Sequence, residues 1–462
     1  MATHDFAHSI NPATEDVLAT FPQATPEDIE RALSDTSRAF RQWRSISFAE
    51  RAAPLHQAAA YLRQHKSHLA GLITAEMGKP IAEAEAEVDK CAWNCEFYAD
   101  QAERLLATQP HPSTATESFV EFVPLGTILA IMPWNYPLWQ VIRFAAPALM
   151  AGNTAMLKHA SNVPQCALAV EEIFCASGFP SGVFRTLLLP STAAMRLIDD
   201  PRIAAVTLTG SDQAGSQVAA AAGRALKKTV LELGGSDPFI VLDDADLAVA
   251  VKIGVQARYQ NAGQSCVAAK RFIVVESVFT EFQERFVEAV RALRVGDPSE
   301  RTTQVGPLAR NDLRAALAQQ LQRSLAQGAT LLIGGERRPG RGYFFTPTVL
   351  SGVEPAMPAA CEEVFGPVAA LIKVRNAEDA VQIANASPYG LGANVWTNDL
   401  ALARRLAREL EAGFVAINGR VTSDPRLPFG GVKRSGYGRE LSEYGIREFM
   451  NIQTVWIGPA KS

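Results

Sequence analysis

A glutamate and a cysteine lie among glycines in the middle of the chain, in Val230-Leu-Glu-Leu-Gly-Gly235 and Gly263-Gln-Ser-Cys266. Small neighbours leave room for a substrate to reach the thiol, whose thiolate is nucleophilic. A nearby carboxylate can serve as its base or activate water. Each segment alone is weak, because Gly-Gly after a strand is usually a turn and a lone cysteine is usually a small buried hydrophobe. Their combination with Pro133-Trp-Asn-Tyr-Pro137 is far more specific.

Composition narrows the class of protein. The chain has 462 residues, of which 48% are hydrophobic, so we expect two or three globular domains. The formal net charge is only -4 and there is no sustained basic run, which makes nucleic acid a poor candidate partner. The N-terminal residues have no basic start followed by an apolar stretch, so no signal peptide is expected and a cytoplasmic location is predicted.

The most apolar region, residues 126–152, is interrupted by Pro133, Pro137 and Pro147 and carries Arg143, which argues against a membrane helix. The six cysteines are not spaced as metal ligands with the histidines. We therefore expect reduced thiols and no metal site. The sequence predicts core packing for every cysteine except Cys266, namely Cys91, Cys95, Cys166, Cys175 and Cys361.

The elements that must position these groups follow a recognisable order. A mostly helical layer is expected from Pro26 to Leu106, with Thr25 as its first cap, and a strand over Phe119–Val123. Strands then alternate with helices over residues 126–231 and again over 238–428. Such alternation predicts two α/β units with parallel sheets, and their junction is a favoured place for a small-molecule site. The β-like run Phe449–Trp456 needs a covered edge, which an oligomer contact would provide.

Five motifs in order resemble the aldehyde dehydrogenase superfamily along essentially the whole chain. Any one of them alone would be weak, and together they are specific. The wording of the motifs is most similar to a bacterial subgroup of succinate semialdehyde dehydrogenases that use NAD(P). The motifs are Pro133-Trp-Asn-Tyr-Pro137, Leu231-Glu-Leu-Gly-Gly235, Gly263-Gln-Ser-Cys266, Glu362-Glu-Val-Phe-Gly-Pro367 and Pro428-Phe-Gly-Gly-Val-Lys-Arg-Ser-Gly-Tyr-Gly-Arg-Glu440.

The resemblance implies an α/β fold of the aldehyde dehydrogenase type, in which a Rossmann-type cofactor domain is joined to an α/β catalytic domain and a small β oligomerisation element. The implied oligomer is a homodimer or a homotetramer. The expected ranges are 1–112 and 126–231 for the cofactor domain, 232–428 for the catalytic domain, and 113–125 and 441–462 for the oligomerisation element.

The resemblance also implies catalytic roles. Cys266 matches the nucleophile that attacks the aldehyde and forms a thiohemiacetal, which becomes a thioester after hydride loss. Asn135 matches the side-chain donor of an oxyanion hole, alongside the backbone N–H of Cys266. Glu232 matches the general base that activates water to hydrolyse the thioester. The bland alternatives are a turn role for Asn135 and a surface charge for Glu232.

The cofactor is expected to be NADP or NAD, although the chain has no Gly-x-Gly-x-x-Gly. Val206-Thr-Leu-Thr-Gly-Ser211 ends a strand before a helical pattern, whose start can face a pyrophosphate. At Ser161 many NAD-using relatives carry a glutamate that would repel a 2'-phosphate, so the serine predicts that NADP is accepted. The cofactor contacts implied by the resemblance are Trp134, Lys158, Ser161, Gly210, Ser211, Leu233, Glu363 and Phe365.

Arg143 raises the question of which aldehyde is used. In an apolar stretch it needs an anionic partner, and the resemblance makes that partner a substrate carboxylate, with an internal salt bridge as the alternative. Gln260 stands where a relative has a second arginine, so Arg258 or Ser423 is expected to complete the carboxylate site. The same relative has a redox-partner cysteine two residues after its nucleophile. This chain has Ala268 there, so no disulfide switch of that type is expected.

The function expected from these features is oxidation of succinate semialdehyde to succinate with reduction of NAD(P). The alternatives left open are an aldehyde dehydrogenase for another semialdehyde or an aliphatic aldehyde, a coenzyme A-acylating enzyme, and a noncatalytic binding protein on the same fold.

Overall fold

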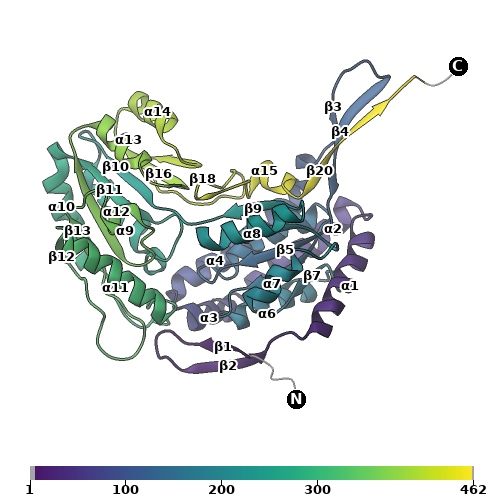
Figure 1. Ribbon diagram of the computed structural model, residues 1–462, viewed down its shortest axis with the longest axis horizontal. Coiled ribbons are helices and arrows are strands. Elements are labelled where there is room, and N and C mark those ends of the chain that lie inside the picture. The colour runs from purple at the N-terminus through teal and green to yellow at the C-terminus, as the bar shows by residue number, and fades with distance from the viewer. Residues whose placement is uncertain (1–5, 460–462) are drawn as a thin grey trace.

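The computed structural model describes residues 6–459, and its two larger sheets lie in two adjoining lobes (Figure 1). In the first sheet the five strands other than β19 are mutually parallel, and β19 joins β9 antiparallel at the edge. Its order is β19 (Gly436–Tyr437), β9 (Lys228–Glu232), β8 (Ile203–Thr209), β5 (Thr127–Met132), β6 (Thr154–His159) and β7 (Phe184–Thr186).

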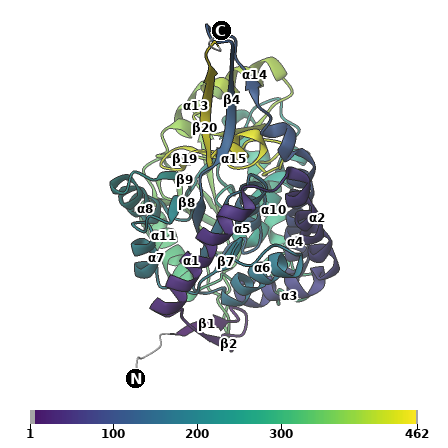
Figure 2. The ribbon, with the colours of Figure 1, turned by 90° about the vertical axis from the view of Figure 1, so that its right-hand side faces the viewer.

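Helices of the N-terminal half pack around this first sheet, as the sequence predicts (Figure 2). The expected start at Thr25 is confirmed. Its hydroxyl accepts a hydrogen bond from the Asp28 N–H, the Asp28 carboxylate accepts one from the Thr25 N–H, and Pro26 occupies the first turn. The helices are α1 (Pro26–Trp43), α2 (Phe48–Gln64), α3 (Lys66–Met77), α4 (Ile81–Leu105), α5 (Trp139–Met150), α6 (Pro164–Ala176), α7 (Ser191–Leu197) and α8 (Asp212–Arg224).

The second lobe is built on a seven-stranded sheet that is parallel except for the edge strand β12. Its order is β12 (Thr330–Ile333), β13 (Thr348–Ser351), β14 (Val368–Val374), β11 (Ala269–Val275), β10 (Asp237–Val241), β16 (Gly392–Trp396) and β17 (Phe414–Ile417). Its helices are α9 (Leu247–Tyr259), α10 (Glu276–Arg291), α11 (Asn311–Ala326), α12 (Pro358–Cys361), α13 (Ala377–Asn385) and α14 (Leu400–Glu409).

An arm projects from the first lobe and ends in the C-terminal strand (Figure 1). It is a three-stranded sheet of order β20 (Met450–Ile457), β4 (Glu117–Pro124) and β3 (Gln109–Pro110), preceded by the short helix α15 (Ser442–Arg447). The predicted C-terminal strand is therefore present and pairs antiparallel with β4. Ile452 and Trp456 on β20 are 63% and 56% exposed, so the arm carries apolar side chains in open solvent.

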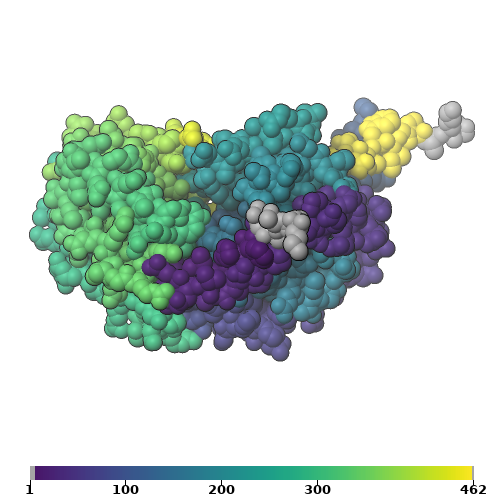
Figure 3. All heavy atoms as spheres, turned by 60° about the horizontal axis from the view of Figure 1, so that its bottom comes forward, coloured from purple at the N-terminus to yellow at the C-terminus, as the bar shows by residue number. Residues whose placement is uncertain are grey.

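A hairpin that the sequence did not predict, β1 (Phe6–Ile10) with β2 (Val17–Pro22), runs along the outside of both lobes (Figure 3). Its turn contacts the second lobe, where the Tyr343 N–H donates to the Pro12 carbonyl at 2.8 Å and Arg341 pairs with Asp16 at 2.7 Å. The hairpin therefore links the N-terminus to the far lobe.

The hydrophobic core is divided between the two larger sheets. Separate clusters of buried apolar side chains pack on the first and second sheets, and the first extends into the N-terminal helices. The expected domain boundaries stay a prediction, although they leave out the segment that forms β19. Within residues 6–459, no helix is both long and apolar enough to span a membrane.

Candidate active site

The predicted catalytic and cofactor residues of the first lobe come together at one edge of its sheet. Asn135 follows β5, Lys158 lies near the end of β6, Gly210 follows β8, and Glu232 is the last residue of β9. These four strands are parallel, so their carboxyl ends meet at the same edge, where α/β proteins commonly bind ligands.

The loop that carries Cys266 approaches this edge from the second lobe. It follows the 3-10 turn Gln260–Gly263 and precedes β11, and three consecutive residues before it, Asn261, Ala262 and Gly263, have positive φ. A side chain at Gly263 would collide with the Gly366 carbonyl, and one at Gly235 would come within 2.6 Å of the Cys266 carbonyl oxygen. The glycines that flank the two motifs therefore permit a close approach of backbones.

Asparagine side chains tie this loop to the first lobe. The Asn261 amide donates to the carbonyl oxygens of Asn135 at 2.8 Å and Gln264 at 3.1 Å. The Asn135 amide also donates to the Gln264 carbonyl, at 3.1 Å. Since a primary amide has two N–H groups, Asn135 keeps one for a substrate oxygen, as an oxyanion donor requires.

Lys270, which the sequence did not indicate, holds the backbone of the loop that carries Cys266. Its buried ammonium donates to the carbonyl oxygens of Ser265 at 3.0 Å and Cys266 at 2.8 Å, and lies 3.6 Å from the Glu363 carboxylate. The nucleophile loop and the glutamate expected to hold the cofactor ribose are thus joined through one cation.

Burial disfavours the charged form of both Cys266 and Glu232. Desolvation raises the pKa of the Cys266 thiol to about 12, while the positive charges of Arg143 and Lys270 oppose the shift. Desolvation likewise raises the pKa of Glu232 well above its usual range, and the neighbouring Glu440 adds to the increase. Both Glu232 carboxyl oxygens are buried without a hydrogen-bond partner, so they are free to bind a water molecule.

The remaining predicted cofactor residues surround the junction between the lobes. The Trp134 and Phe365 rings meet edge to face at 5.7 Å, and Glu363 accepts a hydrogen bond from the Gly235 N–H at 2.9 Å. A side chain at Gly234 would collide with the Glu363 carboxylate. Leu233 is buried beside them.

The cofactor's phosphate end fits the start of α8. Ser211 caps that helix by accepting from the Ala214 N–H at 3.2 Å, and the buried Thr209 hydroxyl just before it has no hydrogen-bond partner. The Lys158 side chain is mostly buried, and desolvation lowers its pKa. Ser161 is exposed, with room for a larger group. The residues present therefore suit a nicotinamide dinucleotide, and those that would hold it are Trp134, Lys158, Ser161, Gly210, Ser211, Leu233, Glu363 and Phe365.

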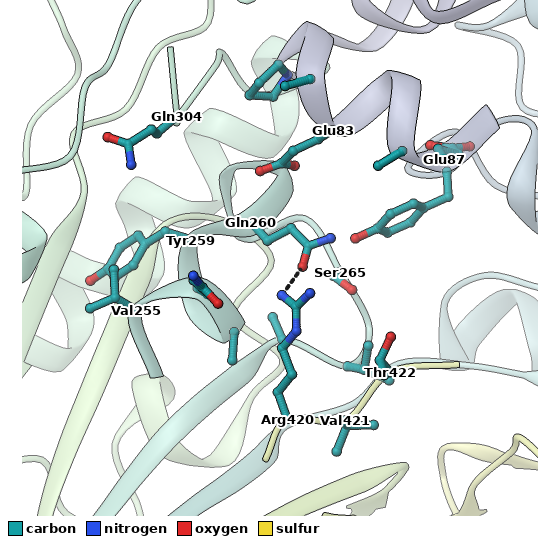
Figure 4. A pocket seen from close by; sticks show the side chains of 18 of the residues that line it. Glu83, Glu87, Val255, Tyr259, Gln260, Ser265, Gln304, Arg420, Val421 and Thr422 are labelled. Atoms are coloured by element: carbon teal, nitrogen blue, oxygen red, sulfur yellow. Dashed lines mark hydrogen bonds between the residues drawn. The ribbon is translucent and has the colours of Figure 1, made fainter. Parts of the chain in front are cut away.

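A cavity of about 990 Å³ leads to Cys266 from another direction. Helices α4, α5 and α9, the end of α10 and the segment after β17 line it, and Figure 4 shows part of this wall, with Arg420 turned toward Gln260. The Arg420 guanidinium donates to the Gln260 side-chain oxygen at 2.8 Å. Glu232 and Glu363 are not among the lining residues, so this cavity suits the aldehyde and leaves the cofactor its own approach.

Comparison with known proteins agrees with this arrangement. The sequence profile of the aldehyde dehydrogenase family matches residues 2–455. The chain belongs to the aldehyde dehydrogenase family. It is 52% identical, over 97% of its length and 99% of the relative's, to a probable NADP-dependent succinate-semialdehyde dehydrogenase of Synechocystis sp..

Two further relatives are informative. Succinate-semialdehyde dehydrogenase [NADP(+)] 1 of Mycobacterium tuberculosis is 51% identical over 97% of this chain and 99% of its own. The structure of the Streptococcus pyogenes succinic semialdehyde dehydrogenase in complex with NADP+ superposes with a TM-score of 0.96, at 38% identity over 98% of this chain and 100% of that one. The expected aldehyde dehydrogenase fold is therefore confirmed.

In this aldehyde dehydrogenase Arg143 forms the internal salt bridge that was the alternative to a substrate contact. The guanidinium forms an ion pair with Glu440, and both side chains are buried. The acid that an arginine in an apolar stretch needs thus comes from the chain itself. Arg143 also lines the cavity, so its contact with a substrate carboxylate stays a prediction.

Arg258 cannot complete the carboxylate site, so that suggestion was wrong. The side chain is fully buried and donates to the backbone carbonyls of Gly263, Val364 and Gly366, and it does not line the cavity. The guanidinium instead satisfies backbone carbonyl groups of the loops around Gly263 and Gly366. Ser423 does line the cavity, and its hydroxyl accepts a hydrogen bond from the Lys90 ammonium at 2.7 Å.

Several polar residues of the cavity were missed. Glu83, Glu87 and Lys90 on α4 and Arg420 after β17 all line it. The first three are spaced i, i+4 and i+7, which places them on one face of a helix. A stripe of charges facing the catalytic lobe was the signal that could have found them.

The expectation that the other cysteines pack in the core was wrong for two of them. Cys91, Cys95 and Cys166 are fully buried, whereas Cys175 and Cys361 are exposed. Cys175 follows the buried Phe174 near the end of α6, and consecutive residues of a helix point to different sides. Cys361 is the last residue of the short helix α12.

Proposed function

We propose that this aldehyde dehydrogenase oxidises succinate semialdehyde to succinate, with NADP as the preferred hydride acceptor. The observation that carries the proposal is the nucleophilic Cys266 facing a cavity whose unpaired charges are mainly positive. The names of the relatives from Synechocystis and Mycobacterium tuberculosis support the same substrate.

The charges of the cavity wall favour an anionic aldehyde. Glu87 is paired with Lys79, Arg143 with Glu440, and the exposed Arg301 with Glu85. The other charged lining residues are Lys90, Lys252, Arg420 and Glu83. Three cations therefore face a single carboxylate, and burial raises the pKa of Glu83 to about 7, which weakens its negative charge near neutrality.

In the first step the Cys266 sulfur bonds to the aldehyde carbon, and the thiol proton leaves to a base or to solvent. The carbonyl oxygen becomes an alkoxide that accepts hydrogen bonds from the free Asn135 N–H and the backbone of Cys266. These donors stabilise the charge that appears on the oxygen in the transition state. The product of the step is a thiohemiacetal.

A bound nicotinamide supplies the hydride acceptor when the thiohemiacetal collapses to a thioester. The unpaired Glu232 carboxyl oxygens then take a proton from water as it attacks the thioester carbon. The carbon–sulfur bond breaks, which releases the acid and restores the thiol. In total one aldehyde, one oxidised cofactor and one water give one carboxylate, one reduced cofactor and two protons.

NADP is favoured because Ser161 is neutral, small and exposed. A glutamate at this position would repel a 2'-phosphate, whereas a serine hydroxyl can donate a hydrogen bond to it. The roles of the eight predicted cofactor residues form part of this proposal.

We further propose that the protein is a homodimer or a homotetramer that acts in the cytoplasm. The projecting arm supports the oligomer, since Ile452, Trp456 and Ile457 are exposed on its edge strand β20. The six free thiols agree with a reducing compartment.

The test is a steady-state assay of reduced-nicotinamide absorbance with succinate semialdehyde or butanal, each with NADP or NAD. The proposal predicts a higher kcat/KM for the carboxylated aldehyde and for NADP. Equal or better turnover of butanal would overturn the substrate, and higher efficiency with NAD would overturn the cofactor preference. Added coenzyme A should not change the product, because water is the acceptor.

A further inference from the structure

Lys90 stands out among the charged residues that line the aldehyde cavity. Its side chain is half-buried, and among residues 6–459 no carboxylate lies within ion-pair distance of its ammonium. The acids nearest in sequence are engaged elsewhere, because Asp89 pairs with Lys66 and Glu87 with Lys79. The cavity therefore contains a cation that is not directly paired with a carboxylate among the described residues.

The position of Lys90 is fixed by two neutral groups. Its ammonium donates to the Ser423 hydroxyl at 2.7 Å and lies 4.4 Å from the centre of the Trp139 ring. The ring face attracts the cation without neutralising it, and the hydroxyl can still donate its own proton to an acceptor. Lys90 and Ser423 thus present adjacent donors to the cavity.

A second cation is close by. Trp139 and Arg143 are four residues apart on α5, so they lie on one face of that helix, about 6 Å apart along its axis. Since Lys90 sits over Trp139, it lies within about one turn of Arg143, which is also near Cys266. Two cations and a hydroxyl from three separate segments converge on one part of the cavity, where an anion would relieve their repulsion.

We propose that Lys90, beside the Ser423 already expected at the carboxylate site, binds the carboxylate of the aldehyde substrate, so that Lys90 is a specificity-determining residue of this enzyme. The inference rests on the proposed oxidation of a carboxylated aldehyde and names the residues responsible. It also answers how recognition is completed with Gln260 in place of an arginine. Arg420, the other candidate, is hydrogen-bonded to Gln260 and faces Glu83 across the cavity (Figure 4).

The protonation of Lys90 gives the proposal a distinctive signature. Burial first, and then repulsion by Arg143, lower the pKa of Lys90 to about 8. The charge of Lys90 is present below that pH and is lost above it. Efficiency with the anionic aldehyde should therefore fall as the pH rises through about 8, relative to efficiency with a neutral aldehyde.

Glu83 also lines this cavity and has a pKa of about 7, so its ionisation lowers the ratio at a lower pH than Lys90 does and persists in Lys90→Met. The other titratable groups around Lys90 do not change the comparison. Asp424 is paired with Arg426, and Glu87 is held by Lys79. Glu440 is paired with Arg143, and the buried Cys91 has a pKa raised well above its usual range. Cys266 and Glu232 act on every aldehyde, so their titration cancels in the ratio of kcat/KM for succinate semialdehyde to that for butanal.

The experiment measures this ratio from pH 6.5 to 9.5 with NADP, for the wild-type enzyme and for Lys90→Met, Lys90→Arg, Arg420→Met and Lys252→Met. In the wild type we expect a ratio well above one that falls as the pH rises through about 8. Lys90→Met should lower the ratio at pH 7 by about 10- to 100-fold and remove the fall that is centred at about pH 8, because one charge-assisted contact is lost. Lys90→Arg should keep the preference and extend it to higher pH.

Controls separate the possible failures. Lys252 is exposed on the cavity wall, so Lys252→Met removes the same charge and should leave the ratio within about twofold. A wild-type ratio near one would overturn the proposed function itself. A high wild-type ratio that survives in Lys90→Met, or collapses only in Arg420→Met, would overturn the role of Lys90 alone. Equal losses for both aldehydes in Lys90→Met would also overturn it.

Discussion

Arg143 and Glu440 form an ion pair in which the side chains are only 2% and 6% exposed. The pair joins α5 to the segment before α15, beside Glu232, whose pKa depends on both charges. Forming a buried ion pair costs desolvation energy. Removing one partner strongly destabilises the fold, because the other charge is left buried without a partner.

We therefore predict that Glu440→Gln lowers the free energy of unfolding by about 3–5 kcal/mol, because Arg143 loses its partner. Chemical denaturation measures the change. The matched control is Glu378→Gln, which breaks an exposed ion pair with Arg405 and should cost at most about 1 kcal/mol. Similar small effects of the two substitutions would show that the Arg143 charge is not held by Glu440.

Asn135→Ala should lower kcat by about 100-fold or more, since the loss of one oxyanion donor costs about 3 kcal/mol of barrier. The loss should be the same for succinate semialdehyde and butanal, because the oxyanion is common to both. Steady-state kinetics with each aldehyde measures it. A change confined to KM would contradict the role of the side-chain amide in the transition state.

Glu232→Gln should separate acylation from hydrolysis. The variant should still produce a rapid burst of one equivalent of reduced cofactor, while steady turnover falls by about 10²- to 10⁴-fold. Stopped-flow absorbance resolves the two phases. Loss of the burst together with turnover would place Glu232 in an earlier step.

The pH profile of kcat should reflect the buried environment of Glu232. Only the ionised carboxylate can take a proton from water, and burial and Glu440 raise its pKa. Turnover should therefore increase with pH to values above the usual range of a carboxyl group, provided that hydrolysis limits the rate. A profile of kcat that is flat from pH 5 upward, with hydrolysis shown to be limiting, would contradict this environment.

Ser161→Glu should reverse the cofactor preference. The introduced carboxylate repels the 2'-phosphate of NADP and can accept hydrogen bonds from the ribose hydroxyls of NAD. We expect kcat/KM for NADP to fall by at least about tenfold while that for NAD is kept or improved. Ser161→Ala is the control, and it should change each value only a few-fold. Unchanged selectivity in the glutamate variant would show that position 161 does not face the phosphate.

The order of the elements, and the places in the fold of the three residues predicted to be catalytic, could be predicted from sequence because each depends on local patterns. Thr25 and Pro26 predict the start of α1, and the glycine-flanked Glu232 and Cys266 occupy the strand end and the loop that their motifs indicate. The β1–β2 hairpin was missed because its strands are short and its contacts, such as Pro12 with Tyr343, span more than 300 residues.

Partners of charged residues were the least predictable feature. The apolar surroundings of Arg143 in the sequence indicate that it needs an anionic partner. They do not indicate that Glu440, about 300 residues further along the chain, is that partner. Arg258 looked available in sequence and is instead buried against backbone carbonyls. Lys90 lies in none of the five motifs, and only the fold places it over Trp139 in the cavity.

The most direct test of the account is to trap the acyl enzyme. Glu232→Gln is mixed with succinate semialdehyde and NADP, quenched in acid, and digested for peptide mass spectrometry. We expect a succinyl group on the peptide that contains Cys266, formed only when both substrates are present. No adduct in a variant that still reduces NADP, or an adduct on another cysteine, would contradict covalent catalysis by Cys266.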